Sequence, residues 1–369
     1  MRITDVEVVQ LRKPMAKPLV VSRGTLAART AIVVLVHTDE GISGLGESVG
    51  DSSGVVPIIR DQLAPLLIGE DPFDIERLWE KMYTSRVYWD LKGALVIAMS
   101  GIDIALWDIK GKSLGVPVYQ LLGGACRRKI RAYASDLFWD EPEVMARAAA
   151  TYVHDGFPVV KTHIGRDLEG DIVRLTAMRK AIGGEAGLMI DINCGYDRPT
   201  AVQMGKRFEE FSPLWYEEPL RPHDVEGYRQ LRGQVGIPIA LGENEFTKYG
   251  FLELFKHEAV DYVMPDPARV GGITETKKIA SLAEAFNLIL TPHNFSSGIL
   301  LAATLHLMAA TPNADLLEFD VTGTGIYEEL LVEPLKVDGG VVDIPQGPGL
   351  GVVLTDEVRE RYAVSPLPS

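Results

Sequence analysis

The sequence predicts an α/β protein built around a (β/α)-barrel, with a smaller domain of strands and helices in front of it. The chain has 369 residues, of which 46% are hydrophobic, enough for a large core and an appended domain. From about residue 130, short apolar strand candidates alternate with amphipathic helical stretches, as in βα units. Most of these strands end in an ionisable residue, and active sites form at the carboxyl ends of barrel strands.

Residues 1–125 are predicted to form the smaller domain, with strands first and helices after them. I-T-D-V-E-V-V-Q-L and T-A-I-V-V-L-V-H-T are strand candidates, and helices are expected around Val55–Leu67, Asp74–Ser85 and Ala94–Leu114. The glycine-rich G-I-S-G-L-G-E follows the second strand. Its glycines lack the spacing of a dinucleotide-binding motif and the helix start that follows one, so no nucleotide site is predicted there.

Residues 126–322 are predicted to form the barrel. Its eight strand candidates recur at intervals of roughly 22 to 30 residues, about the length of one strand, one helix and two loops. They are I-R-A-Y-A near residue 130, P-V-V-K-T-H near 160, G-L-M-I-D near 190, L-W-Y-E-E near 217, I-P-I-A-L-G-E near 240, D-Y-V-M-P-D near 263, L-I-L-T-P-H near 290 and D-L-L-E-F near 318. In the remaining segment, 323–369, L-K-V-D-G-G-V-V-D-I-P predicts a hairpin without a barrel partner that packs back on the N-terminal domain.

The charge and cysteine content narrow the kinds of partner and compartment. A net charge of −14 argues against nucleic acid or an anionic membrane as a partner, because both attract basic surfaces. Cys126 and Cys194 are the only cysteines, which is not a disulfide framework and fits a reducing compartment. The N-terminal stretch M-R-I-T-D-V-E-V-V lacks an apolar run of signal-peptide length, and no segment approaches the eighteen apolar residues of a membrane span. We expect a cytoplasmic protein with a small-molecule carboxylate as its partner.

Three carboxylates end three consecutive predicted barrel strands. They are Asp191, Glu217 and Glu243. Three acids at one barrel mouth repel one another and raise each other's pKa unless a cation neutralises them. Hard oxygen ligands in that number suit Mg²⁺, with positions left open for water and substrate. Each acid alone could cap the following helix or pair with a surface lysine, but the three together predict a magnesium site.

The other strand ends supply bases and hydrogen-bond donors. In V-K-T-H-I-G, Lys161 and His163 point to the same face of a strand, because side chains alternate. Asp266 and His293 end adjacent strands, so the carboxylate can orient the imidazole and stabilise the imidazolium; a capping Asp and a structural His are the alternative. Glu318 lies in apolar L-L-E-F, where burial favours a protonated acid that donates to a developing oxyanion or merely fills the barrel.

These groups suggest one kind of chemistry. A metal and hydrogen-bond donors would hold a substrate carboxylate while a base removes the proton on the adjacent carbon. The resulting dianionic enediolate would be stabilised electrostatically. Lys161 with His163 on one wall and His293 on the other could serve opposite configurations of that carbon.

The motifs together resemble the mandelate racemase subgroup of the enolase superfamily over nearly the whole chain. G-I-S-G-L-G-E and S-G-I-D-I-A-L-W-D-I-K-G-K match the cap, and the strand-end residues match the barrel in order. The resemblance implies a (β/α)7β modified TIM barrel under an N-terminal α+β capping domain, and homo-oligomers from dimer to octamer. It further implies Mg²⁺ bound by Asp191, Glu217 and Glu243, an Asp266–His293 dyad, Glu318 bonded to a substrate carboxylate oxygen, and Asn193 in contact with substrate.

The chain departs from the subgroup's K-x-K pattern, because K-T-H places His163 where a second lysine is usual. Members resembling this pattern are mostly acid-sugar dehydratases, so we predict removal of the α-proton of an aldonate or aldarate and loss of the β-hydroxyl, giving a 2-keto-3-deoxy acid. The alternatives are a racemase, epimerase or lactone cycloisomerase, and a non-catalytic ligand-binding homologue. His163 is a base, an acid or a binding residue in these hypotheses. Cap loops near Met15–Ala28 and Val49–Val55 are expected to close over the substrate.

Overall fold

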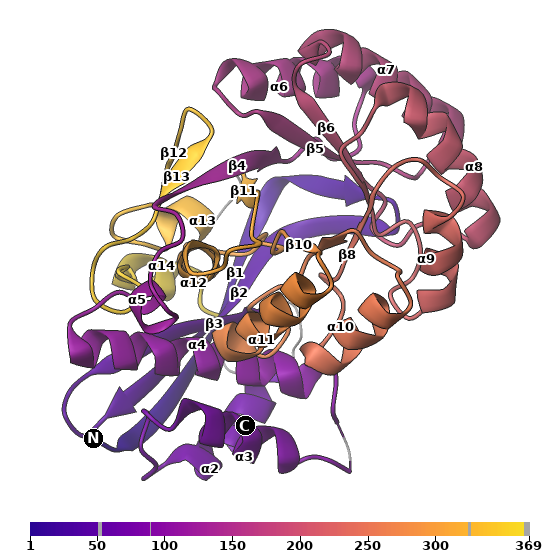
Figure 1. Cartoon of the computed structure of the whole chain (residues 1–369). Helices are drawn as coiled ribbons and strands as arrows, with labels where there is room; N and C mark the ends of the chain where they lie inside the picture. The colour runs from indigo at the N-terminus through magenta and orange to yellow at the C-terminus, as the bar shows by residue number, and fades with distance from the viewer. Residues whose placement is uncertain (51–53, 89, 324–325, 365–369) are drawn as a thin grey trace.

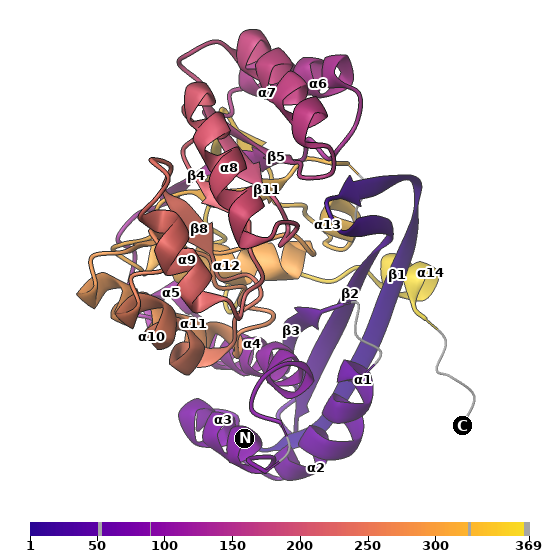
Figure 2. The ribbon, with the colours of Figure 1, turned by 90° about the vertical axis from the view of Figure 1, so that its right-hand side faces the viewer.

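Figures 1 and 2 show a computed structural model of the chain, which describes residues 1–50, 54–88, 90–323 and 326–364. The N-terminal part contains a three-stranded antiparallel sheet in the order β1-β2-β3 with helices against it. The strands are β1 (Ile3–Val21), β2 (Gly24–Thr38) and β3 (Ser43–Val49). The helices are α1 (Val55–Pro57), α2 (Ala64–Leu67), α3 (Ile75–Thr84), α4 (Ala94–Leu114) and α5 (Val118–Leu121), with a π-helical stretch (Ile58–Leu63) between α1 and α2.

The second part is the predicted barrel, in which eight strands run parallel and seven helices follow the first seven strands. The strands are β4 (Lys129–Ser135), β5 (Val159–His163), β6 (Gly187–Asp191), β7 (Tyr216–Glu217), β8 (Ile239–Leu241), β9 (Tyr262–Val263), β10 (Ile289–Leu290) and β11 (Leu317–Asp320). The helices are α6 (Pro142–His154), α7 (Leu168–Ile182), α8 (Arg198–Phe208), α9 (Val225–Arg232), α10 (Thr247–Lys256), α11 (Gly272–Ala285) and α12 (Gly298–Ala309). Because β11 pairs with β4, the sheet curves back on itself.

The core of the barrel has an inner and an outer layer, as a (β/α)-barrel requires. Side chains of alternate strand residues fill the inside, among them Tyr133, Met189, Trp215 and Met264. A larger apolar layer lies between the strands and the helices. Figure 1 shows these helices on the outside of the strands. The polar site residues are therefore carried by a rigid and closely packed support.

The two sequence motifs of the cap have structural roles. The glycines of G-L-G-E let β3 approach α4 closely: a Cβ on Gly46 would overlap the carbonyl oxygen of Gly101. Glu47 is buried and reaches across to the start of α12, where it accepts hydrogen bonds from the Ser296 hydroxyl, the Ser297 hydroxyl (2.5 Å) and the Leu300 amide (3.0 Å). Because all three donors lie at the start of α12, the motif joins the cap to the barrel.

The aspartates of the α4 motif serve the same purpose. Asp103 accepts a hydrogen bond from the backbone amide of Thr274 in α11, at 3.0 Å. Asp108 accepts from the amides of Leu45 in the cap and Leu350 in the C-terminal segment, both at 2.8 Å. Both side chains are buried. They accept hydrogen bonds from backbone amides that would otherwise have no partner once the three parts of the chain pack together and exclude water.

The C-terminal hairpin corrects one expectation. It consists of β12 (Val337–Asp338) and β13 (Val341–Asp343), and β13 pairs antiparallel with Lys129–Arg131 of β4. The predicted absence of a barrel partner is therefore wrong. The reason is that β5 pairs only with the last two residues of β4, so the beginning of β4 has an open edge that the hairpin covers.

The rest of the C-terminal segment contacts the cap. It contains α13 (Ile326–Glu329) and α14 (Asp356–Tyr362), and Leu350, Val352 and Val358 join an apolar cluster with Leu11 and Val33 of the cap strands. The division of the chain at 125 and 322 remains a prediction.

The expected loop at Met15–Ala28 is instead a β-hairpin, formed by the ends of β1 and β2, that lies alongside the barrel (Figure 2). Its end is held by barrel loops: the Ser22 hydroxyl donates to the Ile192 carbonyl (2.5 Å), and the Trp139 amide donates to the Val20 carbonyl (3.0 Å). In the second expected loop, the Val49 amide donates to the Ala268 carbonyl (3.1 Å). Residues 51–53 of that loop lie outside the described residues.

Candidate active site

The predicted site residues meet at the carboxyl ends of the barrel strands. His163 of β5 pairs in register with Asp191 of β6, and Asp191 with Glu217 of β7. Lys161 lies at the centre of the acidic side chains. Its Nζ is 2.8 Å from Glu318 Oε1, 3.0 Å from Glu217 Oε1 and 3.9 Å from Asp191 Oδ2.

Lys161 is a fixed cation in this arrangement. Burial alone would lower the pKa of its ammonium group, but the carboxylates of Glu217 and Glu318 outweigh burial and raise that pKa well above its usual value. A lysine that holds its proton so firmly is unsuited to act as a base. It is suited to bind an anionic oxygen.

The His163 side chain is uncharged, in contrast to Lys161. Its Nδ1 lies 2.9 Å from the backbone carbonyl of Asp136, and a carbonyl only accepts, so the ring carries its proton on Nδ1. Nε2, with a free lone pair, faces Asp191 Oδ2 at 3.4 Å. Burial and, after it, the neighbouring Lys161 lower the pKa of the ring to about 3, so His163 is neutral at neutral pH.

A phenyl ring that the sequence did not single out fixes the plane of the His163 ring. Phe138, in the loop after β4, stacks on it with ring centroids 4.1 Å apart and an angle of 5° between the planes. The only signal in the sequence was the aromatic pair Phe138-Trp139 directly after a strand end. A stacked ring restricts the imidazole to one orientation and excludes water from one of its faces.

His293 and Asp266 form the expected pair. His293 Nδ1 lies 2.7 Å from Asp266 Oδ2, and Nε2 lies 3.1 Å from Glu243 Oε2. Burial alone would lower the pKa of His293, but Glu243, Glu318 and Asp266 outweigh burial and raise that pKa to about 10. His293 is therefore an imidazolium at neutral pH, across the barrel mouth from neutral His163.

Glu318 corrects a second expectation. Burial was expected to keep it protonated, and burial does act in that direction, but Lys161 and then His293 lower its pKa well below the usual value. Ser135 Oγ and the Asn294 amide also donate to it, at 2.7 and 2.9 Å. Glu318 is thus an ionised partner of Lys161 and not a donor to an oxyanion.

The remaining carboxylates have the chemistry of a metal site. Burial, followed by repulsion from Glu217, raises the pKa of Asp191 well above its usual value, and burial raises that of Glu217 to about 7. Among the residues that the structure describes, no three His, Cys, Asp or Glu side chains are arranged so that they could hold a metal ion. The donor set nevertheless fits a hard dication, because these oxygens are buried, mutually repelling and balanced mainly by one ammonium group.

Asp191, Glu217 and Glu243 are called the acidic cluster below. Two further residues lie next to it. Asn193 donates from Nδ2 to Asp191 Oδ2 (3.0 Å), and its buried Oδ1 has no hydrogen-bond partner among the described residues. Glu218, the second acid of Y-E-E-P, was not predicted. It is buried, and burial followed by Glu243 raises its pKa to about 7. The adjacent pair of acids was the signal that could have identified it.

Comparison with known proteins agrees with this architecture. The profile of the mandelate racemase / muconate lactonizing enzyme N-terminal domain matches residues 3–123, and an enolase C-terminal domain-like profile matches residues 144–358. The chain is 35% identical to a D-galactarolactone cycloisomerase of Agrobacterium fabrum, over 98% of this chain and 99% of that one. It is 35% identical to an arabinonate dehydratase of Saccharolobus solfataricus, over 89% of each chain. A racemase from Streptomyces coelicolor, solved with bound magnesium, superimposes with a TM-score of 0.90 at 31% identity, covering 98% of this chain and 100% of that one.

An α+β cap over a (β/α)7β barrel, with carboxylates at successive strand ends, defines an enzyme of the enolase superfamily. Within it, the chain belongs to the mandelate racemase / muconate lactonizing enzyme family, because the two profiles together cover most of its length. The predicted family and fold class are thereby confirmed. None of the helices in the described residues combines the length and apolar character needed to cross a membrane.

Proposed function

We propose that the chain is a Mg²⁺-dependent hydro-lyase that removes the α-proton of a sugar acid and eliminates its β-hydroxyl, leaving a 2-keto-3-deoxy acid. The observation that carries the proposal is the placement of the two imidazoles. His163 and His293 face the barrel mouth from strands on opposite sides of it, each with Nδ1 engaged, at 2.9 Å by Asp136 O and 2.7 Å by Asp266 Oδ2. The two Nε2 atoms face the carboxylates, at 3.4 Å from Asp191 Oδ2 for His163 and 3.1 Å from Glu243 Oε2 for His293.

In this proposal Mg²⁺ is held by Asp191, Glu217 and Glu243. The support is the donor chemistry described above, together with the unpaired buried Oδ1 of Asn193, which has the hard character of a metal or substrate-hydroxyl ligand. When bound, the ion neutralises the acids and polarises the substrate carboxylate. Lys161, held by Glu217 and Glu318, binds a carboxylate oxygen of the substrate and stabilises the charge that develops there.

The two histidines divide the proton transfers in the proposed reaction. His163 Nε2 accepts the α-proton, and the C–H electron pair passes to the enediolate. His293, an imidazolium oriented by Asp266, donates its Nε2 proton to the departing hydroxyl, so that the β C–O bond breaks and water leaves. The enol then takes a proton on carbon and becomes the 2-keto acid. The proton that His163 took is released to solvent, and His293 is reprotonated.

A racemase, epimerase or lactone cycloisomerase is the second candidate. It is favoured by the same pair of imidazoles, since a proton removed on one wall can be returned from the other. The relatives named above include a cycloisomerase, a dehydratase and a racemase. The choice among these reactions depends on whether the substrate carries a β-hydroxyl positioned to leave.

The test is a screen of aldonic and aldaric acids in D₂O with Mg²⁺. The expected result is formation of a 2-keto acid, detected with a carbonyl-trapping reagent. Deuterium at C2 of recovered substrate without any 2-keto acid would reject the dehydratase in favour of the second candidate. If neither appears with any acid, and calorimetry detects no Mg²⁺ binding, the enzymatic proposal itself fails.

The proposed setting is the cytoplasm, where a homo-oligomer acts on a small carboxylate. Both cysteines are free thiols in the structure, which suits a reducing compartment. Tyr88 and Tyr249 are 89% and 55% exposed, and tyrosine is enriched at interfaces between subunits. Light scattering of the purified protein tests the oligomeric part of this proposal.

A further inference from the structure

A cavity of about 420 Å³ lies beside the catalytic histidine, between the cap strands and the barrel loops. Its size is within the range of small-ligand sites. Cap and barrel both contribute to its wall. The polar residues that matter here are Gln10, Arg12 and Arg29 from the cap and Asp266, Arg269 and His293 from the barrel.

Three arginines line this one cavity in a chain whose net charge is −14. Arg29 already has partners within the protein. It is buried, its Nη2 lies 2.5 Å from Asp320 Oδ2, and its guanidinium carbon is 4.1 Å from the ring centroid of Phe295. Asp266 is the one acid among the lining residues, and it is engaged by His293. Two guanidinium groups, those of Arg12 and Arg269, are left without a counter-charge among the residues that the structure describes.

The side chains of Arg12 and Arg269 make no hydrogen bond or ion pair with any described residue. Arg12 is exposed, and Arg269 is half-buried with an Nε that is shielded from solvent and has no acceptor. A shielded donor of a charged group without an acceptor is costly, so native proteins rarely retain one. The cost is removed if an anion occupies the cavity.

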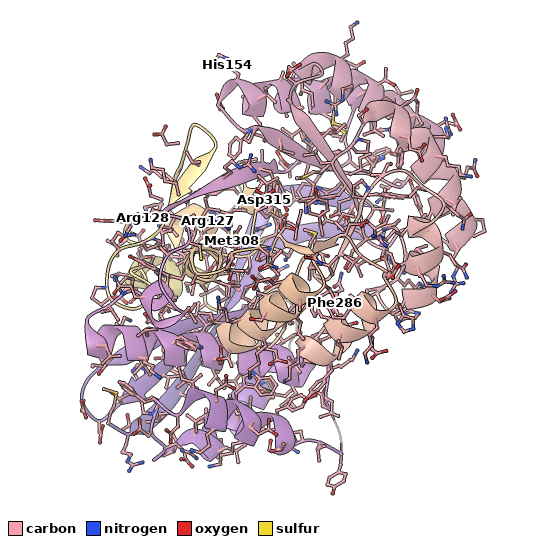
Figure 3. The ribbon with its side chains drawn as sticks, viewed as in Figure 1. Arg127, Arg128, His154, Phe286, Met308 and Asp315 are labelled. Carbon is pink, nitrogen blue, oxygen red and sulfur yellow. The ribbon has the colours of Figure 1, made fainter. Side chains whose placement is uncertain are left out.

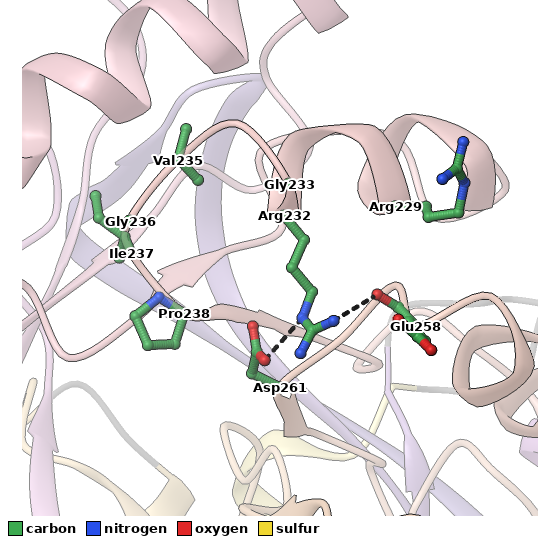
Figure 4. Close-up of a pocket in the computed structure, with 9 residues that line it drawn as sticks. All are labelled: Arg229, Arg232, Gly233, Val235, Gly236, Ile237, Pro238, Glu258 and Asp261. Carbon is green, nitrogen blue, oxygen red and sulfur yellow. Dashed lines mark hydrogen bonds and ion pairs between the residues drawn. The ribbon is translucent and has the colours of Figure 1, made fainter.

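In a second surface hollow of the same chain, the arginine side chains have hydrogen-bond and ion-pair partners. It lies at the amino-terminal end of the barrel strands, before β8 and β9 (Figure 4). There Arg232 is 2.8 Å from Asp261 and donates to the Glu258 carbonyl, while Arg229 is paired with Glu226 at 2.6 Å. The cavity beside His293 differs from this hollow, because its Arg12 and Arg269 have no partner among the described residues and it lies next to the reacting atoms.

We propose that Arg12 and Arg269 bind a second carboxylate at the far end of the substrate, and that the enzyme acts on sugar diacids in preference to monoacids. The inference rests on the proposed function, since Lys161 and the acidic cluster take the reacting carboxylate. The chain of the diacid then passes His293 into the cavity. Guanidinium groups bind carboxylates with paired, charge-assisted hydrogen bonds. Gln10, two residues before Arg12 on the same face of β1, is placed to bind a hydroxyl.

The experiment compares diacids and monoacids of the same carbon configuration, with Mg²⁺ present. The pairs are galactarate and D-galactonate, D-glucarate and D-gluconate, and xylarate and D-xylonate. We expect kcat/KM to favour the diacid of at least one pair by more than 100-fold. Arg12→Gln and Arg269→Gln are each expected to reduce that ratio about 10- to 100-fold, the usual effect of losing a charge-assisted hydrogen bond. The matched control is Arg128→Gln, an exposed arginine just before β4 (Figure 3), which should leave the ratio unchanged.

A binding measurement accompanies the kinetics. Adipate carries two carboxylates and no hydroxyl to eliminate, and hexanoate carries one carboxylate. Calorimetry on the full-length protein should give at least tenfold tighter binding of adipate, and either arginine variant should remove the difference. Equal binding of the two acids, or equal turnover of diacid and monoacid unaffected by the variants, overturns the diacid subsite and leaves the proposed function standing.

Two other outcomes have distinct meanings. A preference for 6-phospho-D-gluconate over D-glucarate that depends on Arg12 and Arg269 would assign the cavity to a phosphate and overturn the diacid proposal. If adipate binds as predicted but none of the six sugar acids exchanges its α-proton or yields a 2-keto acid, the proposed function fails while the anion subsite remains.

Discussion

Glu47 provides a quantitative test of how the cap is joined to the barrel. Its carboxyl is fully buried, and it accepts hydrogen bonds from two serine hydroxyls and the Leu300 amide at the start of α12. Burial raises its pKa from 4.5 to about 7, despite those hydrogen bonds. The folded state therefore holds a proton on Glu47 between these two values, where the unfolded chain has released it.

The sign of the pH dependence follows from this difference. Stability from Glu47 is fully present below pH 4.5 and is lost as the pH rises through about 7, because the folded state binds more protons in that window. At 1.36 kcal/mol per pH unit, the loss between pH 5 and pH 8 is about 2 to 3 kcal/mol. Glu47→Gln keeps the size and an acceptor for Leu300 but carries no charge, so this part of the pH dependence should vanish.

The assay is urea unfolding at pH 5 and pH 8 with EDTA present, so that metal binding does not contribute. The free energy of unfolding of the wild type should fall from pH 5 to pH 8 by about 2 to 3 kcal/mol more than that of Glu47→Gln. Glu210→Gln, at an exposed position, is the control and should follow the wild type. An equal pH dependence in the wild type and Glu47→Gln would refute the assignment of a protonated, buried Glu47.

Three further perturbations test the site and the cap. His163→Asn should lower α-proton exchange about 10²- to 10⁴-fold for the configuration it serves, the size of a general-base contribution; unchanged exchange and turnover, measured by NMR in D₂O, would exclude a catalytic His163. Lys161→Met leaves Glu217 and Glu318 without their shared cation. Turnover should therefore fall at least 10²-fold, while calorimetry still detects Mg²⁺ binding. Retained turnover would contradict a charge-stabilising role for this lysine. Gly46→Ala should lower the free energy of unfolding by about 1 to 3 kcal/mol, since the added Cβ meets the α4 backbone; an unchanged urea midpoint would show that β3 and α4 can separate without cost.

The sequence alone was sufficient for the order of the elements and for the location of the chemistry. Strand candidates and their spacing depend on local apolar patterns, and these were enough to place all eight barrel strands. The topology then brings the strand ends together, so ionisable residues spread from Lys161 to Glu318 could be assigned to one site. The pairing of Asp266 with His293, whose Oδ2 and Nδ1 lie 2.7 Å apart, follows from the same rule.

Only the tertiary structure decided the charge states and the partners. Glu318 is ionised because Lys161, more than 150 residues away in the chain, lies 2.8 Å from it, and no local pattern encodes that distance. The hairpin of β12 and β13 pairs with β4 because an edge is open there, and the cap segment expected as a loop is a docked hairpin. Arg12 of β1 and Arg269 of the loop after β9 line one cavity, although no motif in the sequence links them. Periodicity is a property of neighbouring residues, whereas electrostatics and edge pairing depend on through-space neighbours, and these exist only once the chain has folded.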